Sequence, residues 1–210
     1  MKGRFITFEG GEGCGKSTQI RLLADRLREC GKDVVLAREP GGTVLSERIR
    51  SLVREEMEDP PNARAETLLF LASRAQLVEN VLRPAISSGK WVLCDRFEDS
   101  TFAYQGYGRG FDLVELRRLN EFATGGLLPD KTVLLNVSPE VASFRMRVRE
   151  AVTHTVADRM ECAGEDFHER LRKGFLDLAS AAPNRFSVIS ADGTVDEVAE
   201  KVWNSIRPIL

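Results

Sequence analysis

The sequence lacks several features that mark whole classes of protein. None of its apolar runs approaches the roughly 18 residues that cross a membrane as a helix, and a strand-like segment follows the first methionine almost at once. We therefore expect neither a membrane span nor a signal or transit peptide. These absences predict a cytoplasmic protein that does not associate with a membrane.

Histidine and cysteine are also scarce. The 210 residues include only two histidines, and the four cysteines stand far apart without a C-x-x-C pair. This spacing matches neither a zinc site nor a disulfide framework. We therefore predict structural or incidental roles for the histidines and no site built from cysteines.

Neither sign of charge is in clear excess. The formal net charge is −2, so the chain has no overall basic field for nucleic acid. Arginine nonetheless makes up 23 of the 30 basic residues, and its planar guanidinium can hold phosphate through two hydrogen bonds. A composition bias would give the same total, so only the positions of the arginines can decide.

The most informative stretch lies near the N-terminus. An apolar run over residues 5–8 precedes G-G-E-G-C-G-K-S, and a helical pattern follows. This is the P-loop pattern G-x-x-x-x-G-K-[ST] in the strand, loop and helix context that it requires. Lys16 can reach the β- and γ-phosphates, and Ser17 can bind Mg²⁺. We predict an ATP site formed by Gly10, Gly11, Glu12, Gly13, Cys14, Gly15, Lys16, Ser17 and Thr18; the alternative is a turn that only connects strand to helix.

Strands and helices alternate along the rest of the chain. Besides residues 5–8, buried strands are expected near residues 33–37, 91–94, 131–137 and 186–189, with helical patterns between them. This alternation requires a parallel sheet with right-handed crossovers. We predict an α/β fold, with a five-stranded parallel β-sheet flanked by helices on both faces, in a single domain over residues 1–210.

Charged residues follow two of these strands. Arg38 and Glu39 end the second strand, and Asp95 and Arg96 end the third. Ligands of open parallel sheets bind at the carboxyl ends of strands, so these residues should lie beside the phosphates. A carboxylate there suits Mg²⁺ or its water shell, and a guanidinium suits anionic groups. Surface ion pairs are the alternative.

Two further segments could bind a base. Phe70 and Arg74 are four residues apart in a helical pattern over about residues 65–86, so they share a face. Together they could stack on a base and hydrogen-bond its edge, although periodicity alone favours packing in the core. The segment that contains Ser100, Tyr104 and Gln105 offers polar groups for a base and a sugar.

Arginines gather late in the chain. A helix expected from about Pro139 carries Arg145, Arg147 and Arg149, and a second helical pattern begins near Arg159. The segment 150–157 between them lacks apolar periodicity, and we expect it to be mobile. An arginine-bearing segment of this kind suits a short lid, about residues 145–160, that closes over transferring phosphates. A solvated charged helix is the alternative.

Taken together, these motifs resemble the thymidylate kinase family in its bacterial form. The matching pieces are F-E-G-G-E-G-C-G-K-S-T, R-E-P-G-G-T, L-L-F-L-A-S-R-A-Q, D-R-F-E-D-S-T-F-A-Y-Q-G-Y-G-R-G, D-R-M-E and S-A-D-G-T, and they span essentially the whole chain. The second and fourth pieces are far more specific than the P-loop. The resemblance implies a P-loop kinase fold and a Mg²⁺-dependent, homodimeric enzyme of dTTP biosynthesis that converts ATP and dTMP to ADP and dTDP.

The resemblance also implies a role for each site residue. Glu12 would approach the deoxyribose 3′-hydroxyl, Phe70 would stack on thymine, and Tyr104 would crowd the 2′ position. The implied dTMP site is Glu12, Arg38, Phe70, Arg74, Arg96, Ser100, Tyr104 and Gln105. The implied catalytic residues are Lys16, Arg38, Asp95, Arg96, Arg149 and Arg159, and the implied metal site is Ser17 and Asp95, the latter directly or through water.

One feature distinguishes two versions of this family. Gly13 and Cys14 stand where one version has a P-loop arginine, so the resemblance implies the version whose catalytic arginines lie in the lid. Two other hypotheses remain open from the sequence. The chain could be another P-loop kinase that acts on a nucleoside or a different nucleotide, or an ATP-binding scaffold without turnover.

Overall fold

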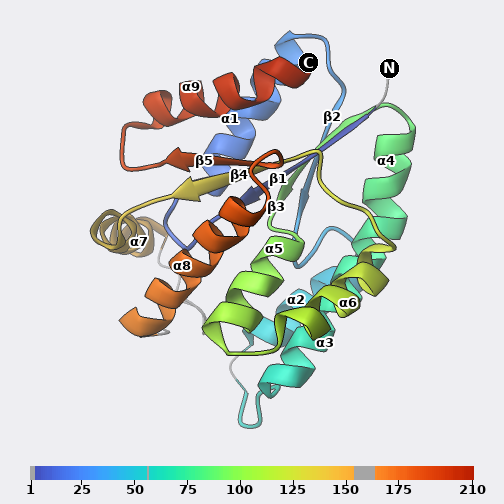
Figure 1. Cartoon of the computed structure of the whole chain (residues 1–210), viewed down its shortest axis with the longest axis vertical. Coiled ribbons are helices and arrows are strands. Elements are labelled where there is room, and N and C mark those ends of the chain that lie inside the picture. Colours follow the sequence, from blue (N-terminus) through green and yellow to red (C-terminus); the bar gives the residue numbers. More distant parts are fainter. Residues whose placement is uncertain (1–2, 56, 154–163) are drawn as a thin grey trace.

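One parallel sheet runs through the structure, a computed structural model that describes residues 3–55, 57–153 and 164–210. Its strands follow the order β2-β3-β1-β4-β5, and every neighbouring pair is parallel (Figure 1). The strands are β1 (Arg4–Glu9), β2 (Val34–Arg38), β3 (Trp91–Asp95), β4 (Lys131–Asn136) and β5 (Phe186–Ser190). The predicted five-stranded parallel sheet is therefore confirmed.

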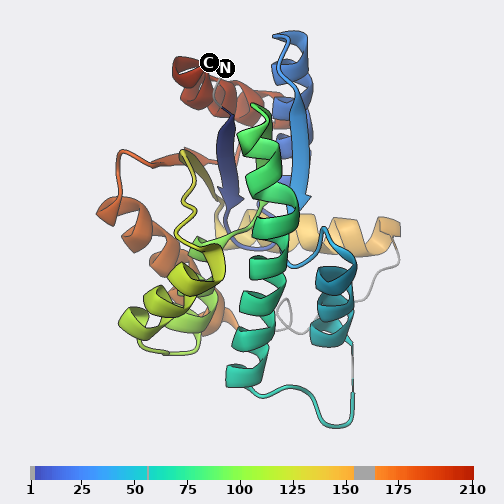
Figure 2. The same ribbon diagram turned by 90° about the vertical axis from the view of Figure 1, so that its right-hand side faces the viewer.

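Helices cover both faces of the sheet, as predicted. On one face lie α1 (Lys16–Glu29) and α9 (Val195–Ile206). On the other lie α3 (Ala63–Leu77), the π-helical segment η1 (Val78–Leu82) and α4 (Arg83–Ser87), which form one long rod in Figure 2, and α8 (Glu165–Ala181). The remaining elements are α2 (Val44–Arg54), α5 (Glu98–Thr101), the π-helical segment η2 (Phe102–Gly108), α6 (Leu113–Thr124), α7 (Pro139–Thr153) and the 3₁₀ segment η3 (Arg207–Ile209). Among the described residues, no helix is long and apolar enough to span a membrane.

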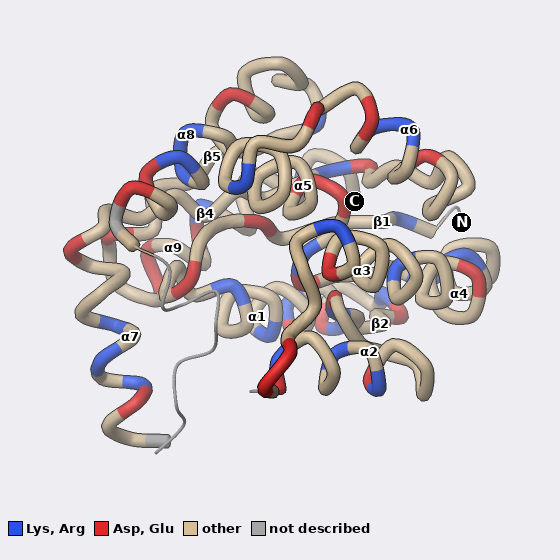
Figure 3. Tube along the Cα trace, turned by 90° about the horizontal axis from the view of Figure 1, so that it is seen from below, with Lys and Arg blue, Asp and Glu red and all other residues tan. Residues whose placement is uncertain are grey.

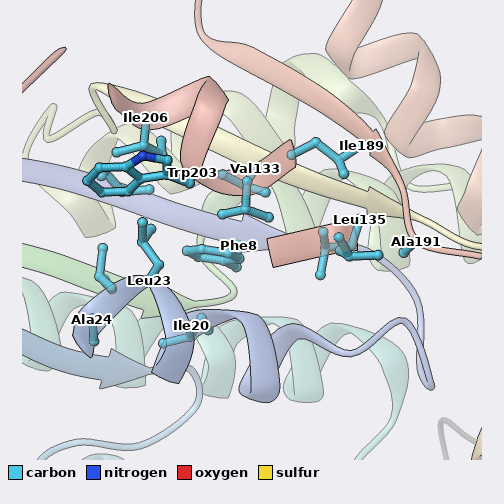
Figure 4. Packing of buried hydrophobic residues seen from close by; sticks show 14 of the residues in the cluster. Phe8, Ile20, Leu23, Ala24, Val133, Leu135, Ile189, Ala191, Trp203 and Ile206 are labelled. Atoms are coloured by element: carbon cyan, nitrogen blue, oxygen red, sulfur yellow. The ribbon is translucent and has the colours of Figure 1, made fainter. Parts of the chain in front are cut away.

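The largest hydrophobic cluster lies between the sheet and the pair α1 and α9. Phe8 and Val133 of the sheet pack with Leu23 of α1 and with Trp203 and Ile206 of α9 (Figure 4). Two further clusters fill the opposite face, one under η1 and α4 and one under α8. Because both faces are covered, the central strands β1, β3 and β4 are buried along nearly their whole length.

The helix ends follow local sequence, with one difference from prediction. Thr43 caps α2 by accepting the Ser46 N–H, and α2 ends at Arg54 because Glu55 adopts an extended conformation. The difference concerns α7, which continues to Thr153, so residues 150–153 of the predicted mobile segment are helical. Glu and Ala favour helix even without an apolar face. The rest of that segment, including Arg159, lies outside the described residues.

The core predicts a simple stability test on α1. Leu27 has no exposed surface and belongs to the largest cluster, so Leu27→Ala should lower the free energy of unfolding by about 2–5 kcal/mol. Leu22 lies on the same helix and is 38% exposed, so Leu22→Ala should cost less than about 1 kcal/mol. Urea denaturation of both variants measures the difference. Equal losses would contradict the packing described here.

Candidate active site

The carboxyl ends of β1, β2 and β3 meet at one cavity of about 690 Å³. Arg38 pairs in register with Asp95, and Asp95 pairs with Phe8, so the polar residues that follow these strands lie side by side, as predicted. The lining includes every predicted catalytic and dTMP-binding residue in the described part of the chain. Arg159, the remaining predicted catalytic residue, lies outside the described residues.

The P-loop forms part of the wall of this cavity. Lys16 begins α1 and is only 7% exposed, and its Nζ donates to the carbonyls of Gly10 (2.9 Å) and Gly11 (3.0 Å). The loop thus encloses an ammonium group at the N-terminus of a helix, where the helix dipole favours anions. The residues from Glu12 to Thr18 line the cavity. Gly10 and Gly11 border a second cavity on the other side of the loop.

Gly13 permits a close contact between the P-loop and α7. Its φ is +70°, and a Cβ at this position would lie 2.6 Å from the carbonyl oxygen of Ala142. A side chain here would therefore displace the first turns of α7 or the loop itself. This geometry fits the family version without a P-loop arginine.

Ser17 and Asp95 provide oxygen ligands beside the P-loop. The Ser17 hydroxyl donates to Asp95 Oδ2 over 3.2 Å, while the buried Asp95 Oδ1 has no hydrogen-bond partner. No group of three or more potential metal-ligating side chains occurs among the described residues. Mg²⁺ commonly takes only one or two protein oxygens together with phosphates and water, so this pair fits the predicted Mg²⁺ site.

Glu12 and Arg96 form an ion pair between the P-loop and the end of β3. Tyr104 donates its hydroxyl to the Glu12 carboxylate over 3.2 Å, and the Arg96 guanidinium lies over the Tyr104 ring at 5.0 Å. Burial alone would raise the pKa of Glu12, but the opposing effect of Arg96, with Lys16 and the Tyr104 hydrogen bond, lowers this pKa to about 2. Glu12 therefore remains ionised throughout the physiological pH range.

Arg74 lines the cavity from α3. Its side chain is buried, and its Nε and Nη2 donate to Glu39 over 2.5–3.1 Å. The remaining N–H groups donate to the Thr101 hydroxyl (2.8 Å), the Phe97 carbonyl (3.0 Å) and the Asn120 side chain. All five N–H groups therefore have protein acceptors. The predicted contact with a base edge requires Arg74 to share or exchange one of these bonds.

Phe70 and Gln105 line the same cavity as the P-loop. Phe70 is only half-buried and lines the cavity, which favours the base-stacking prediction over simple core packing. Gln105 is 2% exposed, and its Nε2 has no hydrogen-bond partner. A buried donor without a partner is costly, so this amide is suited to an acceptor atom on a bound molecule.

Sequence reasoning missed part of the cavity wall. Arg50, Val53 and Arg54 of α2 and Glu66 of α3 also line it. Arg50 donates to the Pro40 carbonyl over 3.0 Å, and Arg109 donates to Glu66 over 2.7 Å. The spacing of Arg50 and Arg54, four residues apart on the helix after R-E-P-G-G-T, was the available signal.

Basic residues extend along α7, as Figure 3 shows. Arg145 and Arg149 line the cavity, whereas Arg147 is exposed and does not. Arg145 donates to the carbonyl of Gly193 over 3.1 Å, which joins α7 to the loop after β5. Arg149 contributes to the low pKa of Glu12. The predicted shared face of Arg145 and Arg149 therefore faces the site.

A P-loop that opens into an arginine-lined cavity, on a parallel sheet of this kind, defines a P-loop nucleotide kinase. The family model described as thymidylate kinase matches residues 8–202. The chain belongs to the thymidylate kinase family.

Individual relatives agree with this assignment. A thymidylate kinase from a Synechococcus strain is 48% identical over 206 residues, which covers 98% of this chain and 95% of the relative. One from Deinococcus radiodurans is 47% identical over 206 residues, covering 98% and 97%. The crystal structure of thymidylate kinase from Ehrlichia chaffeensis superposes with a TM-score of 0.80 at 34% identity and covers 98% of this chain and 100% of that one.

The low pKa of Glu12 predicts a pH-dependent contribution to stability. Its folded pKa is about 2 against an ordinary value of 4.5, so the ionised group stabilises the fold above about pH 4.5 and this contribution is lost as the pH falls toward 2. The stability advantage of the wild type over Glu12→Gln should therefore shrink by on the order of 2 kcal/mol between about pH 6 and about pH 3. Urea denaturation at both pH values measures it, and an unchanged difference would contradict the ion-pair account.

Proposed function

We propose that this chain transfers the γ-phosphoryl group of ATP to dTMP, giving ADP and dTDP, with the site residues in the roles given below. The observation that carries the assignment is one continuous cavity. The P-loop that borders it suits the donor phosphates, and the same cavity presents the half-buried Phe70 ring and the unpaired Gln105 Nε2. We also propose that the enzyme acts in the cytoplasm, where both substrates occur.

The acceptor nucleotide lies in this cavity beside Phe70 and Gln105. Thymine stacks on Phe70, and Gln105 Nε2 donates to a base oxygen, with Ser100 on the same side. Tyr104, which is buried against Glu12, leaves little room for a 2′-hydroxyl. Glu12 receives the 3′-hydroxyl. Arg74 supports this pocket from its buried position. To contact the base edge, one of its N–H groups shares its hydrogen bond between the present protein acceptor and the base.

Arg38 and Arg96 hold the acceptor phosphate. Arg38 is exposed and pairs with Glu47 over 2.8 and 3.0 Å, so its guanidinium can turn to a phosphate at small cost. Arg96 gives up some of its contact with the Glu12 carboxylate and binds the phosphate instead. Because the acceptor oxygen is already anionic, the reaction needs alignment and charge compensation more than it needs a general base.

The phosphoryl transfer itself forms one P–O bond and breaks another. An oxygen of the dTMP phosphate attacks the γ-phosphorus, and the bond to the β–γ bridging oxygen breaks, leaving its electron pair on ADP. Lys16 moves from the P-loop carbonyls to the donor phosphates. Arg149, with Arg159 in the lid of about residues 145–160, compensates charge that develops on the transferred group.

Ser17 and Asp95 would hold Mg²⁺. The ion, when bound, neutralises charge on the β- and γ-phosphates. The Ser17 hydroxyl and the unpaired Asp95 Oδ1 provide oxygen atoms of the kind that Mg²⁺ prefers. Asp95 acts either as a direct ligand or through a bound water.

The test of this function is ADP release with ATP and Mg²⁺ across dTMP, dUMP, UMP, CMP and thymidine. We expect turnover to be highest with dTMP, reduced with UMP by the 2′-hydroxyl, and absent with thymidine, which lacks a phosphate. Phe70→Ala should raise the KM for dTMP about tenfold or more through lost stacking, while thermal stability changes little. Preference for another acceptor would overturn the assigned specificity, and no turnover would favour an ATP-binding scaffold.

We also propose that the enzyme is a homodimer joined through helices. Apolar side chains of two contacting helices, α3 and α6, face solvent in the single chain: Phe122 is 90% exposed, Val114 59% and Leu68 57%. A large exposed apolar surface commonly marks an interface, and a second copy of this chain is the partner that the family resemblance implies.

Phe122→Asp tests the dimer. A charge at the most exposed of these positions should convert the protein to a monomer in light scattering coupled to size-exclusion chromatography. The matched control is Val188→Asp on β5, which is also half-exposed but lies on a different surface and should leave the dimer intact. A monomeric wild type, or a Phe122→Asp variant that stays dimeric, would count against the proposed interface.

A further inference from the structure

Arg96 has an unusual backbone conformation. Its φ is +70°, and within the described residues it is the one residue other than glycine with a positive φ. The left-handed region costs an L-residue about 1–2 kcal/mol. Such a conformation persists only when its surroundings fix it, and it often marks a functional position.

The groups that fix this turn come largely from the end of β1. Glu9, the last residue of β1, has no exposed surface, and its Oε1 accepts the N–H of Phe97 over 2.8 Å. Its Oε2 is hydrogen-bonded to the Ser100 hydroxyl over 2.6 Å. In addition, the Arg96 N–H donates to the carbonyl of Phe8 over 3.0 Å. The turn is therefore tied to the strand that leads into the P-loop.

The other side of the turn is also held. The Cys94 thiol donates to the Arg96 carbonyl over 3.1 Å, and Arg74 donates to the next carbonyl, that of Phe97, over 3.0 Å. Of all these contacts, only those of Glu9 join a buried side chain of β1 to both Phe97 and Ser100, which flank Arg96 on its C-terminal side.

The conformation of the turn decides where the Arg96 guanidinium lies. The guanidinium is directed to Glu12, to the Gly10 carbonyl (3.4 Å) and to the Ser100 hydroxyl (3.4 Å). A change to an extended φ would rotate the Cα–Cβ bond and carry the charge away from the P-loop. The position of the charge therefore depends on the contacts that hold the backbone of the turn, those of Glu9 among them, as well as on the contacts of the guanidinium.

We propose that Glu9 is a positioning residue, which holds Arg96 in the conformation that binds the acceptor phosphate. This inference rests on the proposed role of Arg96 in binding dTMP. Glu9 does not touch substrate. It acts through the backbone of the turn, so its loss should weaken acceptor binding while leaving the donor site intact.

The surroundings of Glu9 indicate which substitution preserves this role. Burial and the neighbouring Asp99 raise the pKa of Glu9 to about 8, so the carboxyl is largely protonated at neutral pH. One carboxyl oxygen accepts the Phe97 N–H, and the other accepts the Ser100 hydroxyl. A glutamine can keep both contacts, because its Oε1 accepts the Phe97 N–H and its Nε2 donates to the Ser100 hydroxyl oxygen, which can accept as well as donate.

The experiment compares Glu9→Gln, Glu9→Met and a control, with kcat, KM for dTMP and affinity for fluorescently labelled ADP as readouts. Glu9→Gln should stay within about threefold of the wild type. Glu9→Met fills a similar volume without an acceptor and should raise the KM for dTMP about tenfold or more, since it leaves the buried Phe97 N–H unpaired. ADP affinity should change by less than about threefold in both variants.

The control is Thr7→Val. Thr7 lies on the same strand, has no exposed surface and would lose one buried hydrogen bond, to Thr132 (2.8 Å), whereas the bonds to Phe97 and Ser100 come from Glu9. Its KM for dTMP should be unchanged. If Glu9→Met does not fold, Glu9→Asp, which is one methylene too short to make both bonds, takes its place with the same expected direction.

The outcomes separate this proposal from the proposed function. An unchanged KM for dTMP in Glu9→Met, or an equal loss of dTMP and ADP binding, would overturn the positioning role while wild-type turnover of dTMP still supports the function. Absence of dTMP turnover in the wild type would instead remove the function. In that case, calorimetry would measure the affinity of the wild type and of Glu9→Met for dTMP. Equal affinities would remove the positioning role too.

Discussion

The acceptor half of the site depends on one buried guanidinium, that of Arg74. Its five N–H groups connect α3 to Glu39 after β2, to the turn after β3, to α5 and to α6. A buried charge without its partners is severely destabilising, so these segments can pack together only with the ion pair in place. The walls around Phe70 and Gln105 are therefore built before any ligand binds, and binding need not supply the free energy to assemble them.

The donor and acceptor halves meet at the Glu12–Arg96 ion pair. Glu12 belongs to the P-loop, Arg96 to the turn after β3, and Tyr104 contacts both. Both charges are therefore oriented in advance, which lowers the cost of reorganising them during phosphoryl transfer. α7 rests on the same loop at Gly13 and extends Arg145 and Arg149 over the cavity. In the proposed function, both substrates would therefore bind at the carboxyl ends of adjacent strands, close to one set of cationic groups.

The sheet and the position of the cavity could be predicted from the sequence because the motifs that indicate them are local. The P-loop spacing and the alternation of strands and helices predict the sheet, and R-E-P-G-G-T and D-R mark the strand ends that form the cavity. The partners of Arg74 and Glu9 could not be predicted, since Glu39, Asn120 and Phe97 are brought to them only by tertiary packing. Periodicity also could not place Phe70, because a half-buried ring on a cavity wall and a core ring have the same helical spacing. The helical residues 150–153 were missed because they lack the apolar periodicity by which a helix is detected in sequence.

A crystal structure with dTMP bound is the measurement that tests the central claim most directly. The account predicts thymine stacked on Phe70, Gln105 Nε2 within hydrogen-bond distance of a base oxygen, and the phosphate on Arg96 with its positive φ retained. Arg74 should keep its ion pair with Glu39. Binding of dTMP elsewhere, or a structure in which Arg74 leaves Glu39 to hold the base, would contradict a pocket that is built before its ligand arrives.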